Sequence, residues 1–174
     1  MDAARWNSMS ISEQIQNKTI EYRIMSIRKE NMAEQKECLN QLLRLSEEWA
    51  DEKTGPSYDA NDEDEFLDKN IYVACLNNRI IAYALGHKKL LKEKTSYNQI
   101  GETAYELDEI YVSKEFRNQG IGKELYHFVE SDVKDEVDLI GLIAMSYRHK
   151  ELLRLYMDEL GFDFNHALLV KRMK

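Results

Sequence analysis

A strand that runs directly into a glycine-containing turn and an amphipathic helix is the feature that most constrains this chain. Residues 105–112 read YELDEIYV, residues 117–122 read RNQGIG, and a helix is predicted from about Gly120 to Lys134. The first amides of a helix lack internal partners, and the helix dipole is positive at that end. Glycines let a ligand approach the backbone without a Cβ in the way. This unit predicts a binding site for an anionic group such as a pyrophosphate.

The rest of the chain alternates strands and helices. The predicted strands cover residues 19–25, 71–76, 80–87, 138–145 and 164–172, and the predicted helices cover residues 31–49, 63–67 and 150–160. Asn77, Asn78 and Arg79 join two of the strands in a hairpin. This order implies parallel pairing within a mixed sheet, hence an α/β (α+β) fold. Residues 1–18 are predicted to be a polar extension and residues 19–174 one domain.

Composition argues against several classes of protein. The 174 residues carry a net charge of −8, which disfavours a nucleic-acid partner. No apolar run approaches the roughly 20 residues that span a bilayer, and the N-terminus lacks the layout of a signal peptide, so a cytoplasmic protein is expected. Cys38 and Cys75 lie far apart, and the four histidines show no metal-ligand spacing. No disulfide framework and no metal site are therefore expected.

Two common phosphate-binding loops do not match the glycine turn. A Walker loop needs GxxxxGK[ST], whereas residues 122–124 read GKE and the first glycine of that motif is missing. A dinucleotide-binding loop needs GxGxxG after the first strand of its unit, whereas this turn follows several earlier strands. Nucleoside triphosphates and dinucleotides therefore fit this turn poorly.

The pattern Arg117-x-x-Gly120-x-Gly122 after a strand that ends Ile-Tyr-Val resembles the signature loop of the GNAT N-acetyltransferase superfamily, which holds the pyrophosphate of coenzyme A. Residues 155–162, LYMDELGF, look like the family's Leu-Tyr-x-x-x-x-Gly-Phe. The motifs lie within residues 105–162, and the element order agrees over roughly residues 19–174. The resemblance implies a single-domain GNAT fold, with a mixed sheet of about six to seven strands that is splayed at the fourth and fifth strands and flanked by helices.

The resemblance implies acetyl-CoA as cosubstrate and no metal. The pantetheine arm would pair with the backbone of the strand at Ile110 and Val112, as an added strand does. The implied cofactor-binding residues are Ile110, Tyr111, Val112, Arg117, Asn118, Gln119, Gly120, Ile121, Gly122, Lys123 and His149. His149 and Leu152 stand where members of the family often carry asparagine and alanine, so the sequence departs from the family there.

Acetyl transfer to an amine needs a base and an acid. Tyr156 resembles the family's general acid, which would protonate the departing thiolate. Glu106 lies where some protein-acetylating relatives carry a catalytic glutamate. Strict alternation would place Glu106, Asp108, Ile110 and Val112 on one face of the strand and Leu107, Glu109 and Tyr111 on the other. A bulge would change that grouping, so Glu109 and Asp108 remain alternatives, as do His149 and a relaying water.

The resemblance therefore predicts an acetyl-CoA-dependent N-acetyltransferase that acts by direct attack of a primary amine. The acceptor is expected to be a small cationic molecule, similar to a polyamine or an aminoglycoside. The acidic residues between Asp59 and Glu65 lie where the family places its acceptor-binding helix. Two alternatives stay open, a protein lysine or N-terminal acetyltransferase and a non-catalytic domain that binds coenzyme A. A homodimer is common in the family.

Overall fold

A computed structural model describes residues 21–27, 36–53, 55, 58–171 and 173. The predicted extension, residues 1–18, lies outside them. Five strands form one sheet in the order β1–β2–β3–β4–β5. They are β1 (Arg23–Ile27), β2 (Asn70–Leu76), β3 (Arg79–Leu90), β4 (Thr103–Val112) and β5 (Leu139–Gly141). Only β4 and β5 are parallel, and the other neighbours are antiparallel. The predicted mixed α/β sheet is confirmed.

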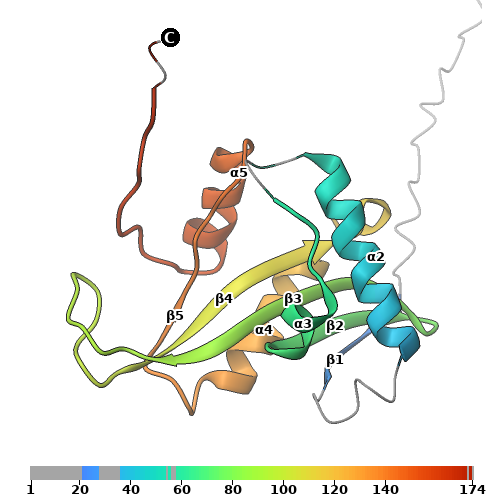
Figure 1. Cartoon of the computed structure of the whole chain (residues 1–174), viewed down its shortest axis with the longest axis horizontal. Coiled ribbons are helices and arrows are strands. Elements are labelled where there is room, and N and C mark those ends of the chain that lie inside the picture. The colour runs from blue at the N-terminus through green and yellow to red at the C-terminus, as the bar shows by residue number, and fades with distance from the viewer. Residues whose placement is uncertain (1–20, 28–35, 54, 56–57, 172, 174) are drawn as a thin grey trace, which may run out of the picture.

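Helices cover both faces of the sheet (Figure 1). Helices α2 (Lys36–Glu52) and α3 (Glu63–Leu67) lie on one face, and α4 (Ile121–Val133) lies on the other. The chain continues through α5 (His149–Arg154) and the π-helical turn η2 (Leu155–Glu159), and a short 3-10 turn, η1 (Lys114–Phe116), precedes α4. We refer to the two faces of the sheet as the α2 side and the α4 side.

Local sequence accounts for several of these elements. Leu39, Leu42 and Leu45 recur at helical spacing and are buried, so they fix the inner face of α2. Asn77 and Asn78 both have positive φ, 48° and 65°, which is the geometry of a tight two-residue hairpin. Strands β2 and β3 are nearly continuous runs of buried residues because helices cover both of their faces.

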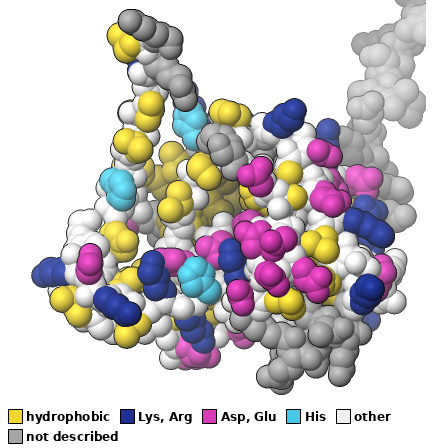
Figure 2. Space-filling view, viewed as in Figure 1, with side chains coloured by type: hydrophobic (Ala, Val, Ile, Leu, Met, Phe, Trp, Pro, Cys, Tyr) yellow, Lys and Arg dark blue, Asp and Glu magenta, His cyan; other side chains and the backbone are white. Residues whose placement is uncertain are grey.

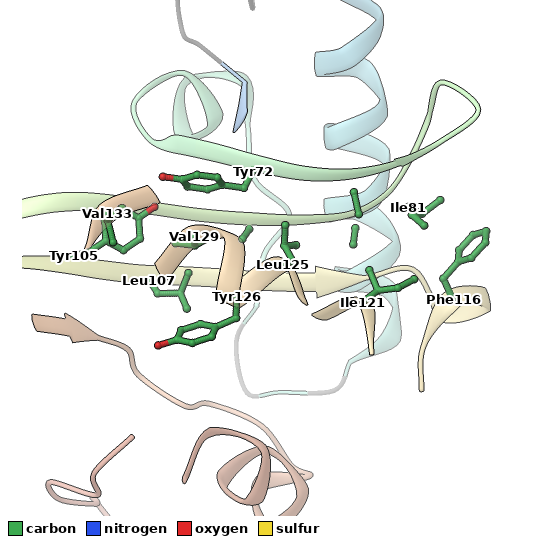
Figure 3. Packing of buried hydrophobic residues seen from close by; sticks show 13 residues of the cluster. Tyr72, Ile81, Tyr105, Leu107, Phe116, Ile121, Leu125, Tyr126, Val129 and Val133 are labelled. Atoms are coloured by element: carbon green, nitrogen blue, oxygen red, sulfur yellow. The ribbon is translucent and has the colours of Figure 1, made fainter. Parts of the chain in front are cut away.

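The core consists of two clusters separated by the sheet. On the α4 side, α4 packs its buried face onto β2, β3 and β4 (Figure 3). Ile121, Leu125 and Val129 are at most 1% exposed there, and each such side chain contributes roughly 1.5–3 kcal/mol through burial. On the α2 side, Leu42 and Phe66 pack against β2 and β3. Tyr111 of β4 also belongs to the cluster on the α2 side, so both layers contact β4.

A bulge interrupts the ladder between β3 and β4. Leu85 pairs with Glu109, but Gly86 pairs with Leu107, so Asp108 is an extra residue in β4. A Cβ at Gly86 would lie 2.5 Å from the carbonyl oxygen of Glu106 and 2.5 Å from the ring of Tyr105, so only glycine permits this approach.

The bulge changes which side chains of β4 share a face. Leu107 belongs to the core on the α4 side, as do Ile110 and Val112, whereas Tyr111 belongs to the core on the α2 side. The grouping expected from strict alternation is therefore wrong. Glu106 shares the α2 side with Glu109, because Asp108 is the extra residue of the bulge and does not count in the alternation.

Other boundaries differ at the C-terminal end. Strand β5 covers three residues, fewer than the predicted 138–145, and the predicted helix 150–160 changes to π-helix after Arg154. Residues 164–171 form no strand, because a strand needs a hydrogen-bonded neighbour and this segment pairs with none of the described strands. Leu168 and Leu169 are 87% and 90% exposed there. The sheet of the described residues thus has five strands, not six to seven.

Two N-terminal predictions extend beyond the described residues. The strand predicted over residues 19–25 is found as β1, and residues 19–20 lie outside the described part. The helix predicted over residues 31–49 is found as α2, and residues 31–35 lie outside it. Among the described helices, none is long and apolar enough to cross a membrane.

Candidate active site

Strands β4 and β5 pair over a very short distance and then separate. The paired residues run from Ala104 with Leu139 to Glu106 with Gly141. Strand β4 continues to Val112, whereas β5 ends at Gly141. Within the described chain, the outer edge of β4 from Leu107 onward therefore has no strand beside it. This is the splay expected at the fourth and fifth strands, and it leaves this edge of β4 without a strand partner, as pairing with an extended ligand would require.

The glycine turn closes the far end of this gap. Gly120 is the N-cap of α4 with φ of 82°, and no side chain caps the helix there. A Cβ at Gly120 would meet nothing within 4 Å, whereas one at Gly122 would lie 3.4 Å from Val112 Cγ2. The start of α4 thus packs on the end of β4 and leaves open space at Gly120. These residues fit the pyrophosphate of coenzyme A, because the first helix amides can bind an anion.

The other residues expected at the cofactor surround this turn. Asn118 has φ of 61°, and the Gln119 side chain donates to the carbonyl of Glu115 at 3.5 Å. Ile121 is 1% exposed, so its side chain packs in the core and only its backbone can meet a ligand. Lys123 lies 3.5 Å from Glu159 and is half-exposed. The structure therefore brings the turn, the end of β4 and η2 together.

Arg117 has a different environment from the one the motif suggests. Its guanidinium pairs with both oxygens of Glu52, at 2.7 and 2.6 Å, and its Nε donates to the carbonyl of Val112 at 2.8 Å. The guanidinium carbon lies 5.2 Å from the centre of the Tyr111 ring. The charge of Arg117 is thus already neutralised by a carboxylate of α2.

Tyr156 lies in the π-helical turn η2. Its ring contacts Phe162 edge-on at 5.6 Å, and Phe162 in turn contacts Tyr126 of α4 at 5.4 Å. Burial raises the pKa of the Tyr156 phenol, which keeps it protonated at neutral pH. π-helical turns are frequent at functional sites, and this one ends at Glu159, two residues before Gly161 with φ of 75°. Tyr156 therefore carries a protonated phenol and lies beside Phe162, which packs on Tyr126 of α4.

Two of the predicted acids lie on the α2 side beside the splay, next to two lysines and a histidine. Glu106 lies 3.2 Å from His87 Nε2 and accepts a hydrogen bond from Lys89 Nζ at 2.8 Å. Asp108 lies 3.0 Å from His87 Nδ1 and 3.3 Å from Lys69 Nζ. Both carboxylates are partly exposed, at 37% and 27%, so a ligand can reach them.

Glu109 is more deeply buried than either of these. Its Oε2 accepts from Asn61 Nδ2 at 2.8 Å, from Tyr83 at 3.0 Å and from Tyr58 at 3.4 Å. Burial raises the pKa of the Glu109 carboxyl, although the hydrogen bonds from Asn61 and Tyr83 and the charge of Lys69 lower it in part. Glu109 is thus held in a polar network that joins β4 to the segment before α3.

His149 lies on α5, not on β4 with these acids. It is exposed at the first residue of α5, and Tyr147 nearby is also exposed. No group of three or more His, Cys, Asp or Glu side chains in the described residues could hold a metal ion.

Sequence reasoning missed several residues around the acids. His87, Lys69 and Asn61 contact them through pairings that span 15 residues or more, which no local pattern reveals. Glu48 and Glu52 were detectable in part, because residues four apart share one face of a helix. Their partner Tyr111 lies 59 residues or more along the chain.

Comparisons with solved structures show the same fold in known proteins. The same fold is found in an aminoglycoside acetyltransferase from an uncultured soil metagenomic sample, solved with sisomicin (16% identity, 88% of this chain and 97% of that chain, TM-score 0.61). The aminoglycoside N-acetyltransferase AAC(6')-Iy, solved with CoA, is similar (16% identity, 87% of this chain and 99% of that chain, TM-score 0.60). A ribosomal-protein-alanine N-acetyltransferase from Brucella melitensis biovar Abortus 2308 is similar as well (16% identity, 88% of this chain and 100% of that chain, TM-score 0.55). At such identities the likeness shows the fold alone.

A search of curated proteins found no match. A family model gives the decisive result. The model of the acetyltransferase (GNAT) family matches residues 37–162, which include all of α2 after Lys36, the splay, the glycine turn and η2. The family uses acetyl-CoA. The chain therefore belongs to the GNAT family of N-acetyltransferases.

Proposed function

We propose that this enzyme transfers the acetyl group of acetyl-CoA to a primary amine of a small cationic molecule, such as a polyamine or an aminoglycoside. One observation carries the choice of acceptor. Three carboxylates, those of Glu106, Asp108 and Glu109, lie on the α2 side of β4 beside the point where β5 separates from it. A cationic amine held there would lie next to the gap that takes the thioester.

The cofactor side of the site is built from backbone. Residues 110–112 of β4 would pair with the pantetheine arm, and the amides of the turn around Gly120 and Gly122 would bind the pyrophosphate. Acetyl-CoA supplies the acetyl group as an activated thioester. Asn118, Gln119 and Lys123 border the same turn, and His149 would contact the cofactor from the start of α5.

The acceptor side attracts positive charge. The ammonium groups of Lys69 and Lys89 already lie against Asp108 and Glu106, which supports an affinity of this surface for cations. Acidic side chains gather over the middle of the same face in the space-filling view (Figure 2). The net charge of −8 adds a long-range attraction for a polycation. An acceptor with several ammonium groups would compete with these internal cations for the carboxylates.

Two proton transfers accompany direct attack. An alkylammonium has a pKa near 10, so a base must take its proton before it attacks. Glu106, with its partly exposed carboxylate, is the proposed base, and Asp108 and Glu109 hold the remaining positive charge. Tyr156 would give its phenolic proton to the departing thiolate. Because its pKa is raised, the phenol is protonated when this step occurs.

A turnover screen tests the proposal. The full chain is incubated with acetyl-CoA and, in turn, polyamines, aminoglycosides, free amino acids and lysine peptides, and the release of free thiol is followed. We expect the highest kcat/KM for small polycations, with a decrease as salt screens the acidic site. Turnover of peptides without turnover of small polycations would overturn the choice of acceptor. Absence of thiol release with every amine would favour a domain that binds coenzyme A without catalysis.

A further inference from the structure

The Arg117 side chain joins three elements that meet at the cofactor end of the site. Two of its nitrogens bind Glu52 of α2, at 2.7 and 2.6 Å. Its third contact, from Nε to the carbonyl of Val112 at 2.8 Å, reaches the last residue of β4. Arg117 itself begins the turn that leads to Gly120. A single planar side chain therefore sets the distances between α2, β4 and the glycine turn.

The pair is partly removed from water. The side chains of Arg117 and Glu52 are 31% and 16% exposed. Burial raises the pKa of the Glu52 carboxyl, but the hydrogen bonds from Arg117 and Tyr111 and the charges of Arg117 and Lys114 outweigh it, and the net pKa is lowered. Both partners are thus charged over the whole neutral range. A forked ion pair of this kind is more rigid than a lysine contact would be.

A second carboxylate of α2 holds the segment before the turn. Glu48 Oε1 accepts from Ser113 Oγ at 3.0 Å and from the Lys114 amide at 3.2 Å. The Tyr111 hydroxyl lies 2.9 Å from Glu48 and 2.8 Å from Glu52. The two glutamates, one helical turn apart, therefore hold the end of β4 and the start of the turn from the side opposite α4.

The turn needs such support. Asn118, next to Arg117, has φ of 61°, and Gly120 has φ of 82°. Left-handed conformations at non-glycine residues cost free energy and persist when neighbouring contacts fix them. No side-chain hydrogen bond caps α4 among the described residues. Arg117 is held from outside the turn by Glu52 of α2 and by the Val112 carbonyl of β4.

We propose that Glu52 is a positioning residue for acetyl-CoA. Through Arg117 it holds the glycine turn and the end of β4 in the arrangement that binds the pyrophosphate. The proposal rests on the placement of acetyl-CoA at this turn. It also gives Arg117 a role that differs from the one its motif suggests, because its charge is neutralised by Glu52 and it acts through geometry.

The main variant is Glu52→Gln, which removes the charge and keeps the size of the side chain. We expect the Kd for acetyl-CoA, measured by calorimetry, and the KM for acetyl-CoA to rise by roughly tenfold, the change that about 1.4 kcal/mol produces. The KM for the amine acceptor is expected to stay within about twofold, because the acids of β4 are untouched. Glu47→Gln is the matched control, since Glu47 is exposed on the same helix. It should change none of these values.

A double-mutant cycle separates positioning from direct contact. If Arg117 and Glu52 act as one unit, the double variant of Glu52→Gln and Arg117→Gln should raise the Kd for acetyl-CoA about as much as Arg117→Gln alone. Glu52→Asp, which restores the charge, should recover part of the affinity. A larger loss in Arg117→Gln, with additive effects in the double variant, would show that Arg117 binds the pyrophosphate itself and would overturn the proposal.

Stability is measured on the same variants by urea unfolding. A positioning role predicts that acetyl-CoA affinity falls in a variant that is still fully folded at the assay temperature. Unchanged affinity in folded Glu52→Gln would overturn the role of Glu52 while leaving the acetyl-CoA site intact. If the unaltered protein also gave no heat with acetyl-CoA, the placement of the cofactor at this turn would fail instead.

Discussion

The two sides of β4 differ in almost every property, although one strand supplies both. On the α4 side, Leu107, Ile110 and Val112 lie in an apolar core that α4 covers. On the α2 side, β4 presents the carboxylates of Glu106 and Glu109, and its first side chain in the core on that side is Tyr111. The bulge at Asp108 makes this separation complete. The comparison indicates that packing is carried by one side of the strand and acceptor chemistry by the other, so the two should respond to different substitutions.

The largest expected effect is on the packed side. Leu125→Ala removes a fully buried side chain of α4 and should lower the free energy of unfolding by about 3–4 kcal/mol through lost burial and an unfilled cavity. Urea unfolding measures it, and kcat of the remaining folded protein should be nearly unchanged. Leu90→Ala, at a residue 57% exposed, is the control and should cost little. Equal costs for the two variants would contradict the division between the sides.

Tyr156 is the exception that sharpens the comparison, because it contacts Phe162 on the packed side yet is proposed to act chemically. Tyr156→Phe should lower kcat by roughly 100-fold, the lower range for a lost general acid, and leave the Kd for acetyl-CoA unchanged. Because burial raises the pKa of this phenol, any alkaline loss of kcat that depends on it should occur at higher pH than for an ordinary tyrosine. Tyr97→Phe, at an exposed tyrosine, is the control. Full activity in Tyr156→Phe would remove it from the acid role.

The exposed acids of the α2 side should affect binding of the acceptor. Asp108→Asn removes one carboxylate near the splay, and we expect the KM for a polycationic acceptor to rise by about tenfold, equivalent to about 1.4 kcal/mol. Stability should change by less than about 0.5 kcal/mol, because Asp108 is partly exposed. Steady-state kinetics at low and high salt give the first value. Glu93→Gln, at an exposed loop acid, should behave as the parent.

The smallest effect concerns the buried acid. Burial raises the pKa of Glu109 above its ordinary value of 4.5, so the folded protein holds this proton more tightly than the unfolded chain does. Its contribution to stability is therefore greatest below pH 4.5 and decreases as the pH rises through the pKa of the folded state. Glu109→Gln should make the free energy of unfolding fall less steeply with pH above 4.5. Parallel pH profiles for parent and variant would refute the assignment.

Features set by local chemistry were predictable from the sequence. The hairpin at Asn77 and Asn78, the strand–turn–helix unit around Gly120 and the short helix at residues 63–67 all depend on neighbouring residues. That helix has a capping box in which Asp62 and Glu65 bind each other's backbone amides. Such features can be predicted without knowing which strands pair with one another.

Features that depend on a second segment were not predictable. The bulge arises because Gly86 of β3 lets β4 approach closely, and a lone glycine in a strand is only a weak signal of it. The fork between Arg117 and Glu52 joins residues 65 apart in the chain. The apolar pattern of residues 164–172 predicts a strand, but a pattern cannot supply the neighbour that the ladder requires.

Asp108 has one more consequence. Strand β4 without this residue would still alternate correctly, with Leu107 and Ile110 toward α4 and Glu106 and Glu109 toward α2. A one-codon deletion at Asp108 would therefore remove a carboxylate and leave every other side chain on its present side. A deletion elsewhere in β4 would instead turn part of the strand over unless the bulge closed to compensate. Evolution can thus add or withdraw a charge here by changing the length of the gene, with no repacking of the interior.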